Sequence, residues 1–348
     1  MWYESLIDRG ILPRVVLRYA IKYGLGRYAR IVERLTEEGV ERQQFKFRAD
    51  CLSKPIAIDV EIANLQHYEL PDELTRSVLG SHLKYSGSFW NEPTQSLNQI
   101  EFATLEQYDM RAEVKSGQSI LDIGAGWGAL TLYLAKKYPE SVITALTNSL
   151  TQKNYIEKAA VERNLHNIKV VKEDIARIDF EKKFDRIFAI EIFEHTRNAK
   201  SLFEKISSWM NPESKLFFQV FSHKKYPQIF DDVATSWMAK HYFTSGMMPY
   251  VGFYDDIQNV FRQERQWYES GIHYHKTLEF WLKNLDQKKP QLLKRVTNNE
   301  AKRSMNVQIN RFELFILICS ELFRYNSGQD WHLMNYLYAP RQITDEEK

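Results

Sequence analysis

Residues Ser119–Thr131 read SILDIGAGWGALT, and this stretch decides the fold. It opens with the apolar run Ile120–Ile123, interrupted by Asp122, which has the length of a short buried strand. The glycines that follow on alternate positions are Gly124, Gly126 and Gly128. A helical pattern of apolar residues then begins at Ala129. Glycines allow the backbone to turn tightly and a ligand to lie against it, facing the first N–H groups of the helix. The order of strand, glycine turn and helix predicts the opening of a nucleotide-binding βαβ unit.

Asp122 indicates which nucleotide this turn binds. A carboxylate two residues before the first glycine would repel a pyrophosphate, but it suits a cationic group such as the methionine part of S-adenosylmethionine (SAM). The glycine pattern also satisfies the dinucleotide fingerprint G-x-G-x-x-A. NAD-binding folds place an acid about 20 residues further on for the ribose, whereas the strand predicted at Val142–Thr147 is followed by Asn148 and Ser149. We therefore favour a SAM site, with a NAD site and a turn that binds nothing as the alternatives.

Strand and helix patterns alternate after residue 111. The expected strands are Ser119–Ile123, Val142–Thr147, Ile168–Lys172, Phe184–Glu191 and Lys215–Phe221, with helices at Gly128–Lys137, Leu150–Asn164 and Asn198–Met210. This alternation predicts an α/β fold with a doubly wound, mostly parallel sheet that binds its ligand at the carboxyl ends of the strands. The segments at those ends are Asp122–Gly126, Thr147–Ser149, Asp174–Ile175, Glu191–His195 and Gln219–His223.

We expect four regions along the chain. They are a helical cap (1–110), a nucleotide-binding core (111–223), an aromatic-rich insert after the fifth strand (224–296) and a C-terminal completion of the core (297–348). A mixed linker is expected at 46–58, a buried helix at Val307–Arg324 and a last strand at Trp331–Tyr338. The insert is interpreted as a lid over the acceptor, with a second small core as the alternative.

Composition narrows the class of protein. The 348 residues carry a formal net charge of +2, so no strong field predicts a nucleic-acid partner. The two cysteines, Cys51 and Cys319, have no C-x-x-C spacing, so neither a disulfide framework nor a metal site is expected. The N-terminus lacks the apolar core of a signal peptide and no run of ~18 apolar residues exists. We expect a cytoplasmic protein.

The N-terminal 45 residues read as helical and basic. Arg14, Arg18 and Lys22 fall at i, i+4 spacing, opposite the apolar residues Leu12, Val15, Val16 and Tyr19. This pattern is typical of a helix that lies on an anionic membrane surface. A packed helix with a solvated basic face is the interpretation we favour. A homodimer is a further interpretation that the sequence leaves open.

Glu191, Glu194 and His195 are the candidate catalytic residues. Methyl transfer is an in-line displacement, and an amine acceptor must lose its proton before it can react. The i, i+3 spacing would bring both carboxylates to one side of a helical turn, and His195 titrates near neutral pH. Acids that complement a helix dipole are the alternative interpretation. Asp174 and Ile175 are expected to hold adenine, unless they form a surface turn.

The motifs together resemble SAM-dependent methyltransferases of the cyclopropane-fatty-acid synthase superfamily, and within it the coclaurine N-methyltransferase-like branch. The motifs are QHYELP at Gln66–Pro71, KYSGSFW at Lys84–Trp90, LDIGAGWGALT at Leu121–Thr131, TNSLTQKNYIE at Thr147–Glu157, EIFEH at Glu191–His195 and GMMP at Gly246–Pro249. The resemblance implies a class I, Rossmann-like methyltransferase that uses SAM and methylates a small aromatic amine.

The resemblance also assigns residues to each ligand. The expected SAM-binding residues are Tyr85, Ser86, Asp122, Gly124, Gly126, Thr147, Asn148, Ser149, Gln152, Asp174 and Ile175. The expected acceptor-binding residues are Tyr85, His223, Phe243, Met248, Tyr274 and Trp331. Glu191, Glu194 and His195 would line the acceptor pocket, with Glu194 and His195 in front and Glu191 behind them.

Departures from the family bear on the choice between branches. Members that cyclopropanate lipids carry a cysteine and a histidine that help hold a bicarbonate base. In this chain the cysteine is replaced by Gly87, and the position of the histidine falls at or beside Gln219. The amine branch often keeps that cysteine, and Tyr274 matches a tyrosine of the lipid branch's site. We favour an amine acceptor. The alternatives are methylation of unsaturated phospholipid acyl chains, and a nucleotide-binding protein without catalysis.

Overall fold

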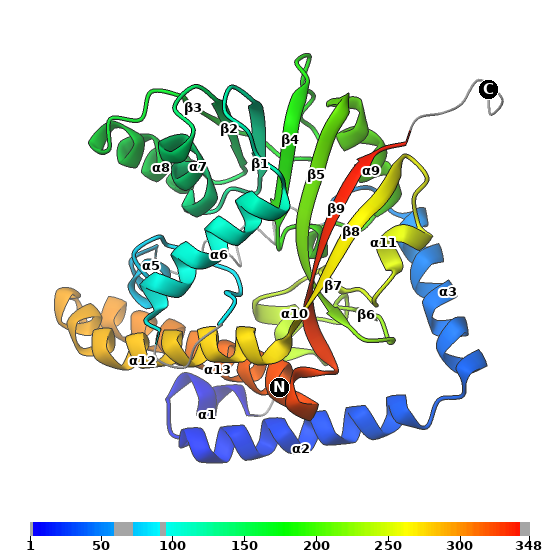
Figure 1. Cartoon of the computed structure of the whole chain (residues 1–348). Coiled ribbons are helices and arrows are strands. Elements are labelled where there is room, and N and C mark those ends of the chain that lie inside the picture. The colour runs from blue at the N-terminus through cyan, green and yellow to red at the C-terminus, as the bar shows by residue number, and fades with distance from the viewer. Residues whose placement is uncertain (1–2, 59–71, 91–94, 342–348) are drawn as a thin grey trace.

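The computed structural model describes residues 3–58, 72–90 and 95–341, and it is built on one seven-stranded sheet of order β3-β2-β1-β4-β5-β9-β8 (Figure 1). The strands are β1 (Ser119–Ile123), β2 (Val142–Thr147), β3 (Ile168–Lys172), β4 (Phe184–Ile190), β5 (Met210–His223), β8 (Phe261–Ser270) and β9 (Trp331–Pro340). Strands β1 to β5 are parallel, β9 is antiparallel to β5, and β8 is antiparallel to β9. The predicted α/β fold with a mostly parallel sheet is confirmed.

Strand β1 lies in the interior of the sheet, between β2 and β4, because both of its faces are apolar. Ile120 packs into a core on one face of the sheet, whereas Leu121 and Ile123 pack into the core on the other face. Its neighbours are β2 and β4, so the order of the strands reverses beside it. Ligands bind in α/β folds at such a reversal, outside the carboxyl ends of the strands.

Helices cover both faces of the sheet. One face packs against α6 (Leu97–Arg111) and α7 (Ala129–Lys137), and the other against α3 (Glu37–Ser53) and α9 (Ala199–Ser208). The helix α8 (Leu150–Glu162) packs beside α7, against β2 and β3. The remaining short elements are α10 (Trp237–His241), α11 (Phe253–Asp256), η1 (Phe193–His195), η2 (Tyr325–Gly328) and the two-stranded sheet of β6 (Gln228–Ile229) and β7 (Met247–Met248).

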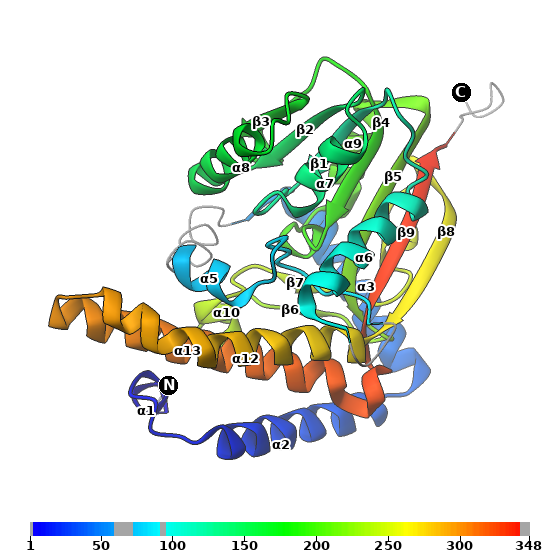
Figure 2. The ribbon, with the colours of Figure 1, turned by 60° about the vertical axis from the view of Figure 1, so that its left-hand side comes forward.

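A layer of helices closes the lower end of the sheet (Figure 2). It consists of α1 (Glu4–Asp8), α2 (Arg14–Glu33), α5 (Asp72–Val78), α12 (Gly271–Arg295) and α13 (Asn299–Arg324). These helices share one apolar core, in which Leu74, Trp281 and Phe312 are buried. Because this core includes Trp127 of the glycine turn, the layer lies against the carboxyl ends of the parallel strands.

Two expectations about this architecture need correction. Within the predicted insert 224–296, β8 joins the central sheet and α12 is a long helix of the lower layer. The predicted linker at 46–58 is helical as far as Ser53, because Phe47 and Cys51 are buried against the sheet. The predicted helix near residues 307–324 exists and begins earlier, at Asn299. Gln66–Pro71 and the C-terminal tail lie outside the described residues.

Arg14 and Arg18 of the basic face predicted on the N-terminal helix are turned inward, whereas Lys22 stays half exposed beside Glu321. Arg14 bonds to Asp286 and Glu313 at 2.5 Å each, and Arg18 bonds to Glu321 at 2.5 Å. The apolar side chains face outward instead, so that Val15 is 78% exposed and Tyr19 is 75% exposed. The expectation of a solvated basic face is wrong here, because carboxylates of α12 and α13 offer Arg14 and Arg18 stronger partners than water.

Among the described helices, none combines the length and the apolar character that crossing a membrane requires. The described part of the chain also holds no group of three or more His, Cys, Asp or Glu side chains arranged to bind a metal ion.

Candidate active site

A cavity of about 360 Å³ lies between the carboxyl ends of the parallel strands and the helices of the lower layer. One half is lined by the glycine turn and the segments that follow β2 and β3, and the other by aromatic residues of α12, α13 and the segment after β5. The volume suits a small ligand. The cavity therefore has two halves of different chemistry, joined at the end of β4.

The glycine turn leaves its backbone open to the first half of the cavity. Gly124 and Gly126 have φ of +68° and +54°, a region that favours glycine. A Cβ at Gly126 would meet nothing within 4 Å, so open space adjoins its backbone. A ligand can approach the main chain here.

Asp122 contributes a buried negative charge to this half. The side chain is 2% exposed, lines the cavity and accepts a 2.6 Å hydrogen bond from Thr131 Oγ1. Burial raises the pKa of its carboxyl to about 6. Among the residues that the structure describes, no cation pairs with it. A buried carboxylate without a cation, facing a cavity, fits a positively charged ligand.

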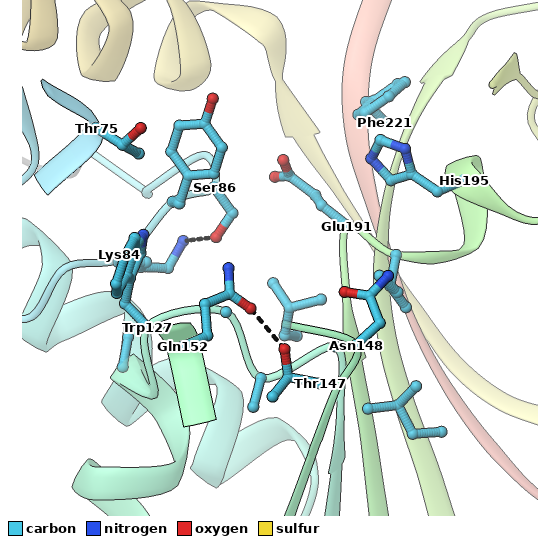
Figure 3. Close-up of a pocket in the computed structure, with 18 of the residues that line it drawn as sticks. Thr75, Lys84, Ser86, Trp127, Thr147, Asn148, Gln152, Glu191, His195 and Phe221 are labelled. Atoms are coloured by element: carbon cyan, nitrogen blue, oxygen red, sulfur yellow. Dashed lines mark hydrogen bonds between the residues drawn. The ribbon is translucent and has the colours of Figure 1, made fainter. Parts of the chain in front are cut away.

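Polar groups after β2 and β3 complete this half. Thr147 Oγ1 donates a 2.6 Å bond to Gln152 Oε1, which leaves the amide nitrogen of Gln152 toward the cavity (Figure 3). Asn148, Asp174 and Ile175 also line it. Ser149 does not: its hydroxyl accepts from Gln152 N at 3.2 Å and caps α8. Ten of the eleven predicted SAM-binding residues thus come together, and the buried acid, open turn and polar groups fit SAM.

Glu191 lies where the two halves of the cavity meet. Its φ of +52° is rare for a residue with a side chain. Its Oε1 accepts from Gly87 N at 2.9 Å and from Gln219 Nε2 at 2.7 Å, and its Oε2 accepts from Tyr274 OH at 2.8 Å. Burial raises the pKa of the Glu191 carboxyl, while Lys84 and these donors oppose the rise. Three donors on one carboxylate hold it in place and favour its charged form.

Glu194 lies behind Glu191, which reverses the predicted order of the two carboxylates. It is fully buried, is not among the described residues that line the cavity, and accepts from Phe221 N at 2.6 Å. Burial, together with the charge of Glu191, raises the pKa of Glu194 well above its usual value. The two carboxylates separate because Glu191 turns to positive φ before η1 begins, so they do not share a helical face.

His195 and a set of aromatic rings form the second half. The imidazole lines the cavity and meets the ring of Phe243 edge-on at 5.0 Å. The predicted residues Tyr85, Met248 and Tyr274 also line it. Tyr242 and Trp281 of the predicted acceptor insert line it as well, whereas Phe315 and Phe323 lie outside every segment that was predicted to bind the acceptor. The helical periodicity of residues 271–324 could have indicated two helices in this region, but periodicity alone does not show which of their side chains reach the cavity.

Two predicted acceptor residues lie elsewhere. His223 and Trp331 are not among the described lining residues, and they pack against each other with ring centroids 4.9 Å apart. His223 Nδ1 accepts from the backbone N–H groups of Lys225 at 3.1 Å and Tyr226 at 2.8 Å. Burial lowers the pKa of His223 to about 4. This histidine stabilises a turn after β5, because its neutral ring satisfies two backbone donors.

Comparisons with known proteins agree with this geometry. The family model described as mycolic acid cyclopropane synthetase matches residues 59–333. (S)-Coclaurine N-methyltransferase of Thalictrum flavum subsp. glaucum is 33% identical over 342 residues, which cover 96% of this chain and 94% of that protein. Cyclopropane-fatty-acyl-phospholipid synthase of Escherichia coli (strain K12) is 26% identical over 78% of this chain and 67% of that protein.

A solved structure extends the likeness to the whole fold. The crystal structure of coclaurine N-methyltransferase bound to N-methylheliamine and SAH matches with a TM-score of 0.91 and 31% identity, over 97% of this chain and 98% of that chain. SAH is the product that SAM leaves after methyl transfer. The chain belongs to the mycolic acid cyclopropane synthetase family and is a SAM-dependent methyltransferase.

Proposed function

We propose that this enzyme N-methylates a small aromatic or heterocyclic amine. The observation that carries the proposal is the Glu191 carboxylate, held by three donors at the boundary between the SAM half and an aromatic chamber. An anionic group among aromatic rings suits an amine that is cationic before or after reaction. The relatives that are named as coclaurine N-methyltransferases support the same acceptor class.

The first half of the cavity would hold SAM. Asp122 would face the cationic part, Asn148 and Gln152 the ribose hydroxyls, and Asp174 with Ile175 the adenine. Tyr85 and Ser86 line the same cavity from the facing loop. When bound, SAM supplies the methyl group on a positively charged sulfur.

The second half would hold and deprotonate the acceptor. We assign His195 as the proton acceptor, because its imidazole lines the cavity and histidine is the side chain that enzymes most often use as a general base. Glu191 would attract the amine and stabilise the positive charge that develops on its nitrogen. Glu194, buried behind the two, would hold the backbone of Phe221 rather than touch the acceptor.

The contacts around Glu191 favour an amine over a lipid acceptor. A Cβ at Gly87 would lie 2.7 Å from Leu333 Cδ1 and 3.0 Å from Tyr274 Cγ, so the cysteine that the lipid branch carries, and that the amine branch often keeps, would not fit here without a shift. Gly87 N and Gln219 Nε2 both bind Glu191 directly. This corner is therefore filled by the protein's own carboxylate and its donors.

Transfer of a labelled methyl group from SAM tests the proposal. The purified enzyme is incubated with a panel of benzylic and heterocyclic amines, and separately with vesicles of unsaturated phospholipid. We expect label in one or more amines and none in lipid. Label in acyl chains alone would overturn the amine assignment, and His195→Ala should abolish transfer to the preferred amine if the proton-acceptor role is right.

We also propose that the outer face of α2 rests on an anionic lipid surface. Val15, Tyr19 and Tyr23 are exposed at i, i+4 spacing on α2, and the exposed cations of the same helix include Arg27 and Arg30. Apolar and basic groups on one helix are the combination that binds such surfaces. A second copy of the chain docked on this face would bring the same positive charges together, so we favour the lipid.

Vesicle sedimentation tests the surface. We expect the protein to bind vesicles that contain phosphatidylglycerol and not vesicles of phosphatidylcholine alone. This binding should weaken as the salt concentration rises, and it should be lost in the double variant Val15→Glu, Tyr19→Glu. Val161→Glu is the matched control, since Val161 is 76% exposed on α8. A wild-type dimer in light scattering that the double variant dissociates, without vesicle binding, would assign the face to a second copy.

A further inference from the structure

Lys84 is a buried cation at the junction of the two halves of the cavity. Its side chain lines the cavity, and the residue is only 3% exposed. Its ammonium donates to Ser86 Oγ at 2.8 Å (Figure 3) and to Gly87 O at 2.5 Å. No carboxylate of the described chain lies within ion-pair distance of it. Burying an ammonium without a direct counter-ion is costly, so its position calls for an explanation.

This ammonium has three neighbours that can stabilise its charge. Two are the oxygens of Ser86 and Gly87, and the third is the face of the Tyr108 ring, whose centroid lies 5.2 Å from Nζ. Burial lowers the pKa of Lys84 to about 8, and the charges of Glu191 and Glu101 oppose that decrease. At neutral pH the group is therefore mostly charged.

Two short routes connect Lys84 to Glu191. Through the loop, Lys84 holds the carbonyl of Gly87, whose N–H donates to Glu191 Oε1 at 2.9 Å. The second route runs through α6 and β5. The ring of Tyr108 lies beside the ammonium, and its hydroxyl donates to Gln219 Oε1 at 2.8 Å. Gln219 Nε2 in turn donates to Glu191 Oε1 at 2.7 Å. The cation thus supports two of the three donors that hold the carboxylate.

We propose that Lys84 is a positioning residue that fixes the Ser86–Gly87 turn and thereby keeps Glu191 ionised and aimed at the acceptor. The inference rests on the proposed amine N-methylation. Because Tyr85 and Ser86 line the SAM half while Gly87 binds Glu191, one ammonium sets the geometry of both ligand sites. Lysine suits the place since it offers three donors at the end of a slender chain.

The other titratable groups that face Glu191 bear on the test. They are Tyr85 of the same loop, Tyr108 of α6, Glu194 and His195 of η1, Tyr274 of α12 and Cys319 of α13. Glu194 is the acid among them, and its negative form would oppose ionisation of Glu191. Lys84 is a further group near Glu191, and its charge lowers the pKa of the Glu191 carboxyl, so removal of Lys84 should raise that pKa.

The pH profile of Lys84→Met separates positioning from simple stability. Wild-type transfer to the amine is measured first, and its absence would refute the proposed function and not this inference. With wild-type activity in hand, we expect Lys84→Met to lower kcat/KM at least ~10-fold and to move the acid limb to higher pH by about one unit, because the nearby positive charge is lost. Circular dichroism and urea unfolding show whether the variant is folded.

Two further variants keep the test decisive. Lys84→Arg keeps the charge, so its acid limb should stay at the wild-type pH even where its rate is lower. Lys182→Met is the control: Lys182 also combines a hydrogen bond, to Thr144 at 2.9 Å, with a ring, Phe184 at 4.7 Å, but at the opposite end of the sheet. An unshifted acid limb in folded Lys84→Met, or an equal shift in Lys84→Arg, would overturn the proposal.

Discussion

The phenol of Tyr274 in α12 donates a 2.8 Å hydrogen bond to Oε2 of Glu191 at the end of β4. This contact joins the lower helical layer to the central sheet inside the cavity. It also places the third donor on a carboxylate whose other oxygen is held by Gly87 and Gln219. The helices of the lower layer thus help to position the charge on which we base the chemistry.

We predict that Tyr274→Phe lowers kcat/KM for the amine by roughly 10- to 100-fold, the rate equivalent of the ~1.5–3 kcal/mol of a hydrogen bond to a charged group. Loss of the donor also raises the pKa of Glu191, so the acid limb should move to higher pH. Tyr338→Phe is the control, because Tyr338 donates to Asp255 at 2.6 Å away from the cavity. A comparable kinetic loss in both variants would contradict the specific role of Tyr274.

Asp122 should make SAM binding depend on pH. Burial raises the pKa of its carboxyl to about 6, so the group is charged above that pH and neutral below it. We expect affinity for SAM to fall as the pH drops through 6, and Asp122→Asn to lose that dependence while binding ~10-fold more weakly or worse. Calorimetric titrations between pH 5 and 8 measure both effects. Asp185→Asn, at the start of β4, should bind SAM like the wild type.

Gly87 should not tolerate a side chain. A Cβ there would press on Leu333 and on Tyr274, so Gly87→Ala is expected to cost about 1–3 kcal/mol of folding free energy and to disturb Glu191. A Cβ at Gly24 in α2 would meet nothing within 4 Å, so Gly24→Ala should raise the free energy of unfolding by ~0.5–1 kcal/mol. Urea unfolding measures the change in folding free energy of both variants. Unchanged stability in Gly87→Ala would contradict the prediction, because it would show that Leu333 and Tyr274 move aside for the added methyl group.

Arg197, between η1 and α9, should hold two segments that are distant in the sequence close to the candidate active site. The guanidinium is fully buried and bonds to Asp50 of α3 and to Asp231 after β6, each at 2.6 Å. We expect Arg197→Met to cost roughly 2–3 kcal/mol, since two charge-assisted hydrogen bonds are lost while their carboxylates keep some access to water. Arg262→Met removes an exposed ion pair and should change the free energy of unfolding by less than ~0.5 kcal/mol.

The sequence predicted the parallel part of the fold well because its information is local. The run from Ser119 to Thr131 encodes a strand, a glycine turn and a helix over neighbouring residues, and hydrophobic periodicity locates β2 to β5 in the same way. Once the strands are parallel, their carboxyl ends must meet at one edge. That rule alone brought Asp122, Gln152, Asp174 and Glu191 to a single cavity.

The remaining features depend on contacts between residues far apart in the chain. Which way α2 faces was decided by Asp286, Glu313 and Glu321, about 270 to 300 residues away from their arginine partners. The positive φ of Glu191 puts that carboxylate in front of Glu194, and no spacing rule encodes it. Periodicity fixes which residues can form a face, whereas packing and charge pairing in the folded chain choose what that face meets, and so the tertiary structure decided the acceptor chamber and the outer surface of α2.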